Sequence, residues 1–195
     1  LYRQALLSLN CFDTPMISDE DRSRMKMYQA ERERDRTKTG VSSPDEWMKT
    51  LEVKVFVENL DSTNIKRIVQ LLNKTNQMNL STRRMTETEL LDWTKGERRR
   101  LWTFRVSDKF GDYGLTGIAS MEQDGQVGKV IDFILSCRVM GRKIEEVMLG
   151  FMTTYARSLR LSRMEAKFLQ TPKNKPCHDF WKHSGFSTDK TKEMF

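Results

Sequence analysis

Cysteine and histidine are scarce in this chain of 195 residues, which holds three cysteines and two histidines. The cysteines, Cys11, Cys137 and Cys177, are an odd number without close spacing, which argues against a disulfide framework. The two histidines do not extend them into a zinc-binding pattern, so no metal is expected. A reduced, cytoplasmic compartment is the simplest interpretation.

Long apolar runs and large blocks of one charge are lacking too. No run approaches the roughly 18 apolar residues that cross a membrane, so no membrane partner is expected. Lysine and arginine total 34 against 27 acidic residues, a net charge of +7 that favours an anionic partner. The charges are mostly mixed, and the one basic cluster, Arg98–Arg100, lacks any RNA-binding or zinc-finger pattern. Nucleic acid is therefore not expected as a partner.

The order of elements predicts an α+β fold. Residues 1–76 are interpreted as a helical or linker segment that includes one strand, where Val53, Val55 and Val57 alternate with polar residues. Residues 77–195 follow the order β-α-β-β-β-α-β-α, which indicates a mixed β-sheet flanked by helices. The chain does not start with Met or with a signal-peptide pattern, so we interpret it as the middle of a longer protein.

The stretch FILSCRVMGRKIEEVMLGFM, residues 133–152, is the main site candidate. A buried strand is expected to end there and a helix to begin, with Gly141 at the turn. The first N–H groups of that helix lack internal partners, and Arg138, Arg142 and Lys143 add positive charge. This combination suits a pyrophosphate, although a plain turn with solvated arginines remains an alternative.

Two motifs resemble signatures of the GNAT acyltransferase superfamily. The sequence RVMGRK resembles its acyl-coenzyme A loop, and TPKNKPCHDFWKHSGF resembles its second signature, with Asn174, Phe180, Trp181, Gly185 and Phe186 matching. The resemblance implies a GNAT-like fold over residues 77–195. It also implies a pantetheine cofactor held by Arg138, Gly141, Arg142, Lys143 and Asn174. Lys143 departs from the family pattern, which has a small residue at that position, so ordinary acetyl-coenzyme A binding is in doubt.

A second resemblance covers nearly the whole chain. The blocks ISDEDRSRMKMYQAERER, LLNKTNQMNLSTRRMTETEL, VSDKFGDYGLTGI and ILSCRVMGRKIEE are similar to the C-terminal half of FkbH-type proteins. These proteins join a HAD-type phosphatase-like domain to a GNAT-like domain, and the family is implicated in loading a glyceryl unit onto an acyl carrier protein for polyketide-type pathways. The resemblance implies the phosphopantetheine of that carrier, or coenzyme A, as cofactor. It implies the carrier and a HAD-like domain as partners.

The HAD reaction needs an Asp-x-Asp motif at the end of a strand, to hold Mg²⁺ against a phosphate. The chain has none, because Asp19 and Asp21 lie at a predicted helix start. The HAD-like domain is therefore expected upstream of residue 1. Two rival functions stay open, which are an acetyl-coenzyme A-dependent N-acyltransferase and a non-catalytic module that docks the carrier protein.

Cys137 and His178 are the candidate catalytic residues. Cys137 lies beside a helix start and Arg138, both of which favour a nucleophilic thiolate, and the alternative is an inert, buried strand-end cysteine. His178 suits a general base because its reference pKa is near neutral, and the alternative is a surface histidine. The polar segment KTNQMNLSTRR, residues 74–84, either contacts a phosphorylated acyl group or the HAD-like domain, or satisfies a helix-to-strand junction.

Overall fold

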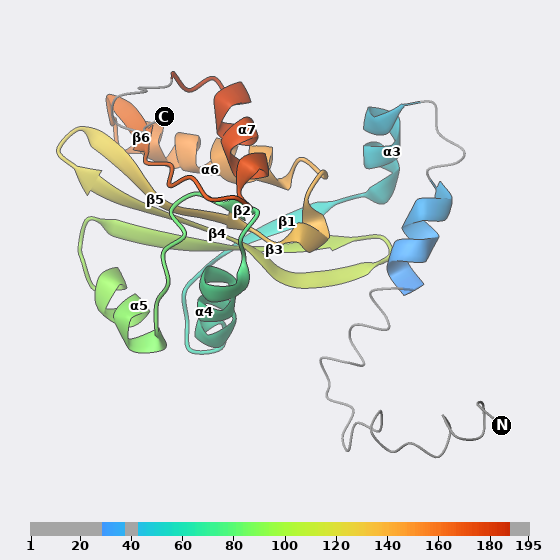
Figure 1. Cartoon of the computed structure of the whole chain (residues 1–195), viewed down its shortest axis with the longest axis horizontal. Helices are drawn as coiled ribbons and strands as arrows, with labels where there is room; N and C mark the ends of the chain where they lie inside the picture. The colour runs from blue at the N-terminus through green and yellow to red at the C-terminus, as the bar shows by residue number, and fades with distance from the viewer. Residues whose placement is uncertain (1–28, 38–42, 188–195) are drawn as a thin grey trace, which may run out of the picture. The chain divides into compact units, whose positions relative to one another are not determined.

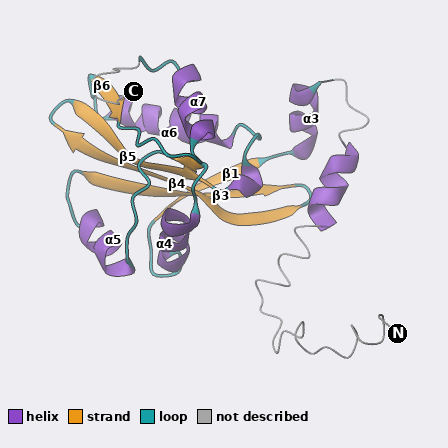
Figure 2. Ribbon diagram, viewed as in Figure 1, coloured by secondary structure: helices purple, strands orange, loops and turns teal. Residues whose placement is uncertain are grey.

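The computed structural model describes residues 29–37 and 43–187. The chain divides into two compact units, residues 1–47 and 48–195, and the second unit holds the sheet. Helix α3 (Pro44–Leu51) leads into strand β1 (Lys54–Asn59), and helices α4 (Ile65–Lys74) and α5 (Glu87–Thr94) follow with the short strand β2 (Met78–Asn79) between them. Figure 2 shows these elements by type.

Three long antiparallel strands form the middle of the sheet. They are β3 (Arg99–Asp108), β4 (Gly111–Asp124) and β5 (Val127–Leu135). The short 3₁₀ helix η2 (Cys137–Val139), helix α6 (Ile144–Ser158), strand β6 (Arg163–Ala166) and helix α7 (Lys175–His183) complete the second unit. The strand order is β1-β3-β4-β5-β2, and β6 pairs with β5 in parallel. The expected mixed sheet flanked by helices is confirmed.

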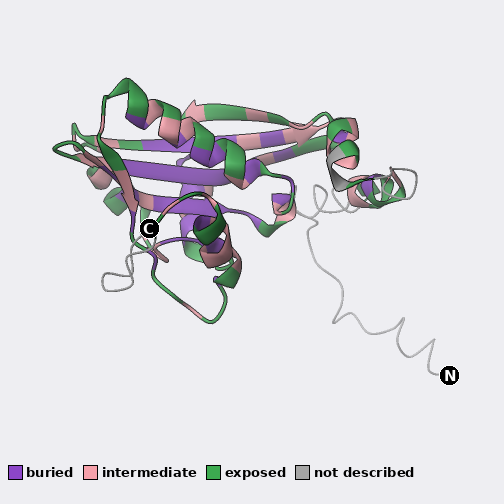
Figure 3. Ribbon diagram, turned by 90° about the horizontal axis from the view of Figure 1, so that it is seen from above, coloured by how far each residue is buried: buried purple, intermediate pink, exposed green. Residues whose placement is uncertain are grey.

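Each face of the sheet is covered by a pair of helices, with α6 and α7 on one side and α4 and α5 on the other (Figure 1). Side chains along β5 alternate between the two faces of the sheet and so contribute to the hydrophobic core on each face. Phe133 and Leu135 belong to the α6–α7 side, and Ile134 belongs to the α4–α5 side. A strand buried on both faces needs the nearly continuous apolar run that the sequence shows. Figure 3 shows the buried residues concentrated in these central strands.

The expected boundary between residues 76 and 77 is not where the compact units divide. Strand β1 pairs with β3 from Lys54↔Ser107 to Asn59↔Trp102, so it is an integral strand of the sheet. Helix α4 also packs on this sheet through a buried apolar stripe of Ile65, Ile68, Leu71 and Leu72. The sheet unit therefore includes residues that the sequence interpretation assigned to the preceding segment.

Residues 29–37 are helical, and strand β2 is only two residues long. It ends early because the Asn79 side chain accepts a hydrogen bond from the Thr82 backbone N–H (2.8 Å), and Thr82 has a left-handed φ of 51°. Residues 186 and 187 are irregular, and Cys11 lies outside the described residues.

Helix α6 buries Ile144 and Met148, whereas Val147 is 47% exposed. Phe151 and Tyr155 are half-buried because their rings pack edge-on against Trp102, with centroids 5.4 and 4.7 Å away.

Candidate functional site

Two residues in the junction between β5 and α6 have left-handed backbone conformations. Gly141 has φ 75° and Lys143, the residue before α6, has φ 57°. Glycine adopts this conformation freely, whereas a lysine there costs about 1 kcal/mol or more. Strained residues of this kind often lie at functional sites.

The cations at the junction differ in how they are held. Arg142 is buried, with its guanidinium 4.7 Å from the centre of the Tyr113 ring and one N–H donated to the Arg138 carbonyl. Arg138 donates to the Ser136 hydroxyl at 3.3 Å, and Lys143 is exposed. Arg142 therefore has a packing role in this loop, and the predicted phosphate role of these three residues stays a prediction.

The N-terminus of α6 already has a carboxylate against it. Glu145 and Glu146 lie in the first turn of α6. Burial raises the pKa of Glu145, repulsion from Glu146 adds to this, and the backbone N–H groups of Glu145 and Gly141 oppose it. Its Oε2 atom is buried without a hydrogen-bond partner among the described residues. A phosphate at this helix end would compete with a carboxylate that the sequence analysis did not single out.

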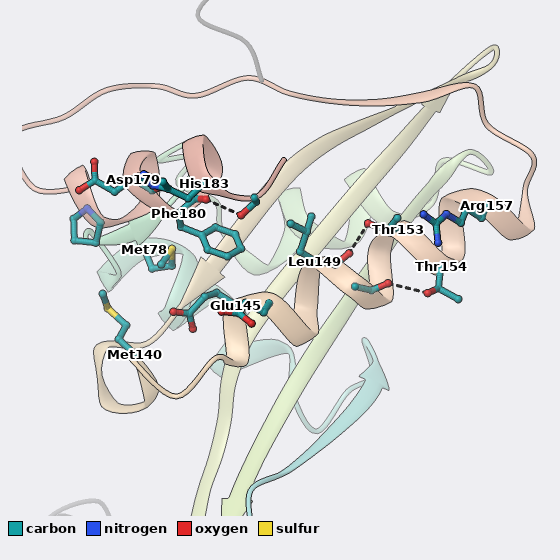
Figure 4. Close-up of a pocket in the computed structure, with 14 residues that line it drawn as sticks. Met78, Met140, Glu145, Leu149, Thr153, Thr154, Arg157, Asp179, Phe180 and His183 are labelled. Carbon is teal, nitrogen blue, oxygen red and sulfur yellow. Dashed lines mark hydrogen bonds between the residues drawn. The ribbon is translucent and has the colours of Figure 1, made fainter. Parts of the chain in front are cut away.

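A groove of about 790 Å³ lies between α6 and α7, beside this helix end (Figure 4). Its apolar lining comes from Met78, Met140, Leu149 and Phe180. Its ionisable lining residues are Glu145, Glu146, Arg157, Asp179 and His183. Such a cavity, mostly apolar with a few polar groups, is the usual form of a ligand site. The groove suits a flexible, largely apolar chain that carries few negative charges.

None of the predicted site residues lines this groove, but residues next to them in the sequence do. The lining residues flank them in sequence, with Met140 and Glu145 around the β5–α6 loop and Asp179 next to His178. The sequence did contain a pattern for the groove-lining residues of α6, since Glu145, Leu149 and Thr153 are spaced four residues apart on one face of the helix. Choosing this face required the position of α7, which the helical period alone does not determine.

Cys137 is exposed at the start of η2, so the alternative of a buried strand-end cysteine is wrong. Of the two described cysteines, Cys177 in α7 is buried, and burial raises the pKa of its thiol to about 12 against the opposing hydrogen bonds from Asn79 and Trp181. Exposure keeps Cys137 available as a nucleophile. Its acylation stays a prediction.

His178 is half-exposed, so the surface alternative describes its position. Its ring lies against Phe168, with centroids 5.3 Å apart, and its Nδ1 atom is 3.5 Å from the Asp179 carboxylate. Hydrogen bonding to Lys175, and then to His178, lowers the pKa of Asp179. The histidine that lines the groove is His183, so the role of His178 as a base stays a prediction.

Asn174 is fully buried and bonded within the chain. Its Nδ2 atom donates to the carbonyls of Asn79 (3.1 Å) and Leu169 (2.8 Å), and its Oδ1 atom accepts from the Thr171 N–H (2.8 Å). The amide donors are thus occupied by the chain's own carbonyls. The polar segment 74–84 also bonds internally, for instance through the Asn79 side chain to the Thr75 carbonyl at 2.9 Å, as the junction alternative expects.

The carboxylates that line the groove, Glu145, Glu146 and Asp179, would repel the phosphates of coenzyme A, whereas Arg157 on the same lining would attract them. The apolar lining does fit a pantetheine arm. The described residues hold no group of His, Cys, Asp or Glu side chains suited to a metal ion, and no helix among them is long and apolar enough to span a membrane.

Several solved structures share this arrangement. The PaiA N-acetyltransferase of Thermoplasma acidophilum in complex with coenzyme A has a TM-score of 0.56 at 10% identity, over 70% of this chain and 91% of that one. A domain from Methanocaldococcus jannaschii has a TM-score of 0.57 at 12% identity, over 71% and 92%. Spermidine N-acetyltransferase from Vibrio cholerae, in complex with coenzyme A and spermine, has a TM-score of 0.51 at 15% identity, over 69% and 82%.

The chain has the GNAT acetyltransferase fold. The fold implied by the two motifs is therefore confirmed. At these low identities the likeness reaches no further than the GNAT fold. No protein-family model matches the chain, and no curated protein matches it in sequence. The FkbH-type resemblance rests on the four sequence blocks and stays a prediction.

Proposed function

We propose that this chain is an acyltransferase domain that exchanges an acyl group with a pantetheine thiol. The observation that supports it is the apolar groove between α6 and α7, which opens beside the β5–α6 loop of a GNAT fold. The similar proteins from Thermoplasma acidophilum and Vibrio cholerae were solved with coenzyme A, which carries the same pantetheine arm.

A carrier-protein arm suits the groove better than free coenzyme A. The carrier-borne arm has a single phosphodiester, so it brings less negative charge toward Glu145, Glu146 and Asp179. The net charge of +7 also suits an acidic carrier protein. We further propose that the acyl group is a glyceryl unit supplied through a HAD-like domain, as the FkbH-type resemblance implies.

In this proposal Cys137 carries the acyl group as a thioester. The thiolate of the carrier attacks the thioester carbonyl, the bond to Cys137 Sγ breaks, and the cysteine leaves as a thiolate. One thioester replaces another, so the exchange needs little bond energy. His178 would accept the proton of the carrier thiol, which gives it a role as general base.

The second candidate is an N-acyltransferase that uses acetyl-coenzyme A. The fold favours it, because the similar structures include N-acetyltransferases. This reaction needs an amine acceptor and forms no acyl-enzyme. The first candidate does form a covalent acyl-enzyme, and mass spectrometry can detect it.

Intact-mass measurement distinguishes them. The full chain is incubated separately with a glyceryl-loaded carrier protein and with acetyl-coenzyme A. We expect the glyceryl mass on wild type and on Cys177→Ala, and none on Cys137→Ala, because Cys137 is exposed and Cys177 is buried. Glyceryl mass that persists in Cys137→Ala contradicts the nucleophile. Acetylation of an added amine without any acyl-enzyme supports the N-acyltransferase instead.

A further inference from the structure

Strand β5 changes its outer partner along its length. Its first half pairs in parallel with β6, from Val127↔Arg163 to Val130↔Ala166. Its second half pairs with β2, through Met78↔Leu135 and Asn79↔Ile134. The chain's own segment therefore covers the part of the β5 edge that β6 leaves.

We call residues Met78–Ser81 the plug. The Leu80 N–H donates to the Phe133 carbonyl of β5 (3.2 Å), and the Leu80 carbonyl accepts from the Leu169 N–H (3.0 Å), beyond the end of β6. The plug thus lies between β5 and the chain that follows β6. Its residues Met78, Asn79 and Leu80 are 0 to 3% exposed, so it fills the space between them.

Polar side chains fix the plug at both ends. Asn174 of α7 bonds the Asn79 carbonyl, as described above. At the other end the Ser81 hydroxyl donates to the buried Asp132 carboxylate (3.2 Å), and Arg83 forms an ion pair with Asp132 (2.5 Å). These bonds accompany the left-handed Thr82, so the surrounding structure holds the segment in a conformation that a β-branched residue disfavours.

An open β5 edge would have consequences for a pantetheine arm. Unpaired N–H and C=O groups of a strand edge bind extended chains that carry amides, and pantetheine is such a chain. The plug occupies these groups, and its Met78 lines the α6–α7 groove. The plug therefore closes the β5 edge to a pantetheine arm, and it also forms part of the wall of the α6–α7 groove.

We propose that the plug determines donor specificity: it closes the β5 edge to a pantetheine arm, confines the arm to the α6–α7 groove and so disfavours free coenzyme A. This inference rests on the proposed use of a pantetheine thiol. It makes Asn174 a positioning residue that latches the plug. A latch and a cofactor ligand predict opposite effects, because removing a ligand weakens coenzyme A binding whereas removing the latch strengthens it.

The test compares Asn174→Ala with Asn73→Ala in the full chain. Asn73 is a matched control, since its side chain also bonds backbone groups at two points, the carbonyl and N–H of Met85, at 2.8 and 3.1 Å, away from the plug. Two quantities are measured: the hydrogen exchange of the Leu80 amide and the affinity for coenzyme A by calorimetry. Ser81→Ala removes one anchor of the plug and serves if Asn174→Ala does not fold.

We expect Asn174→Ala to raise the Leu80 exchange rate and the coenzyme A affinity each by about tenfold or more, since several hydrogen bonds are lost. Asn73→Ala should change neither. Weaker binding in Asn174→Ala overturns the proposal, as does a faster Leu80 exchange without a gain in affinity. The proposal is also overturned if coenzyme A binding to the wild-type chain speeds the hydrogen exchange of the Leu80 amide. Neither measurement depends on acyl transfer, so this test still decides the role of the plug if the transfer assay fails.

Discussion

Asp132 is the residue around which the polar part of the sheet is organised. Its carboxylate is fully buried, accepts from the Ser120 hydroxyl (2.6 Å) and pairs with Arg83. The run KVIDFILSC reads as a continuous apolar strand, so the sequence did not indicate that its one acid has three partners. Those partners come from β4 and from the 81–83 segment, which only the folded sheet brings to it.

Removal of Arg83 tests this arrangement. We expect Arg83→Ala to lower the free energy of unfolding by about 2–4 kcal/mol, because it leaves a buried carboxylate without its cation. The matched control is Arg105→Ala, whose ion pairs with Glu58 and Asp112 are exposed and worth under about 1 kcal/mol. Urea unfolding measures both, and equal losses would show that Asp132 does not depend on Arg83.

The two described cysteines should differ in reactivity. Burial raises the pKa of Cys177 to about 12, so at pH 8 almost none of it is thiolate. We expect iodoacetamide at pH 8 to label Cys137 and to spare Cys177 until the chain unfolds. Peptide mapping by mass spectrometry measures this. Labelling of Cys177 at the rate of Cys137 in the folded chain would contradict the burial.

At the scale of elements, α5 shows how much local sequence can predict. The Thr86-x-x-Glu89 pattern is typical of a capping box, and both bonds of that box are present: the Glu89 N–H donates to the Thr86 hydroxyl (3.2 Å), and the Thr86 N–H donates to the Glu89 carboxylate (2.7 Å). The bonds join residues three apart, so the prediction needed nothing beyond the segment itself.

Loss of this cap should be measurable and pH-dependent. We expect Thr86→Ala to destabilise the chain by about 1 kcal/mol at neutral pH, and Thr94→Ala at the other end of α5 to cost less. Hydrogen bonds from Thr86 lower the pKa of Glu89 from 4.5, so its stabilisation is present above that value and is lost as the pH falls. The difference between wild type and Thr86→Ala in denaturant unfolding should therefore shrink in acid, and a constant difference would argue against the carboxylate bond.

At the scale of the whole molecule, the sheet defines which residues fold together. The sheet unit needs β1 and α4, because β1 pairs along its full length and α4 buries one face of the sheet. We expect a fragment of residues 43–195, which keeps α3 whole, to unfold cooperatively. A fragment of residues 77–195 should fail to do so. Thermal unfolding followed by circular dichroism measures both, and a cooperative transition in the shorter fragment would support a domain boundary at residue 77.

The elements and the fold class follow from local sequence, because helix caps, strand alternation and the apolar run of β5 depend on residues close in the chain. It also located the β5–α6 junction through Gly141 and its neighbouring arginines. Tertiary structure decided what surrounds that junction. The groove needs α6 and α7 side by side, and the plug needs Asn174 to reach Asn79, which is far away in sequence. Periodicity specifies which face of an element is apolar, but the partner that covers it is set only when distant segments pack.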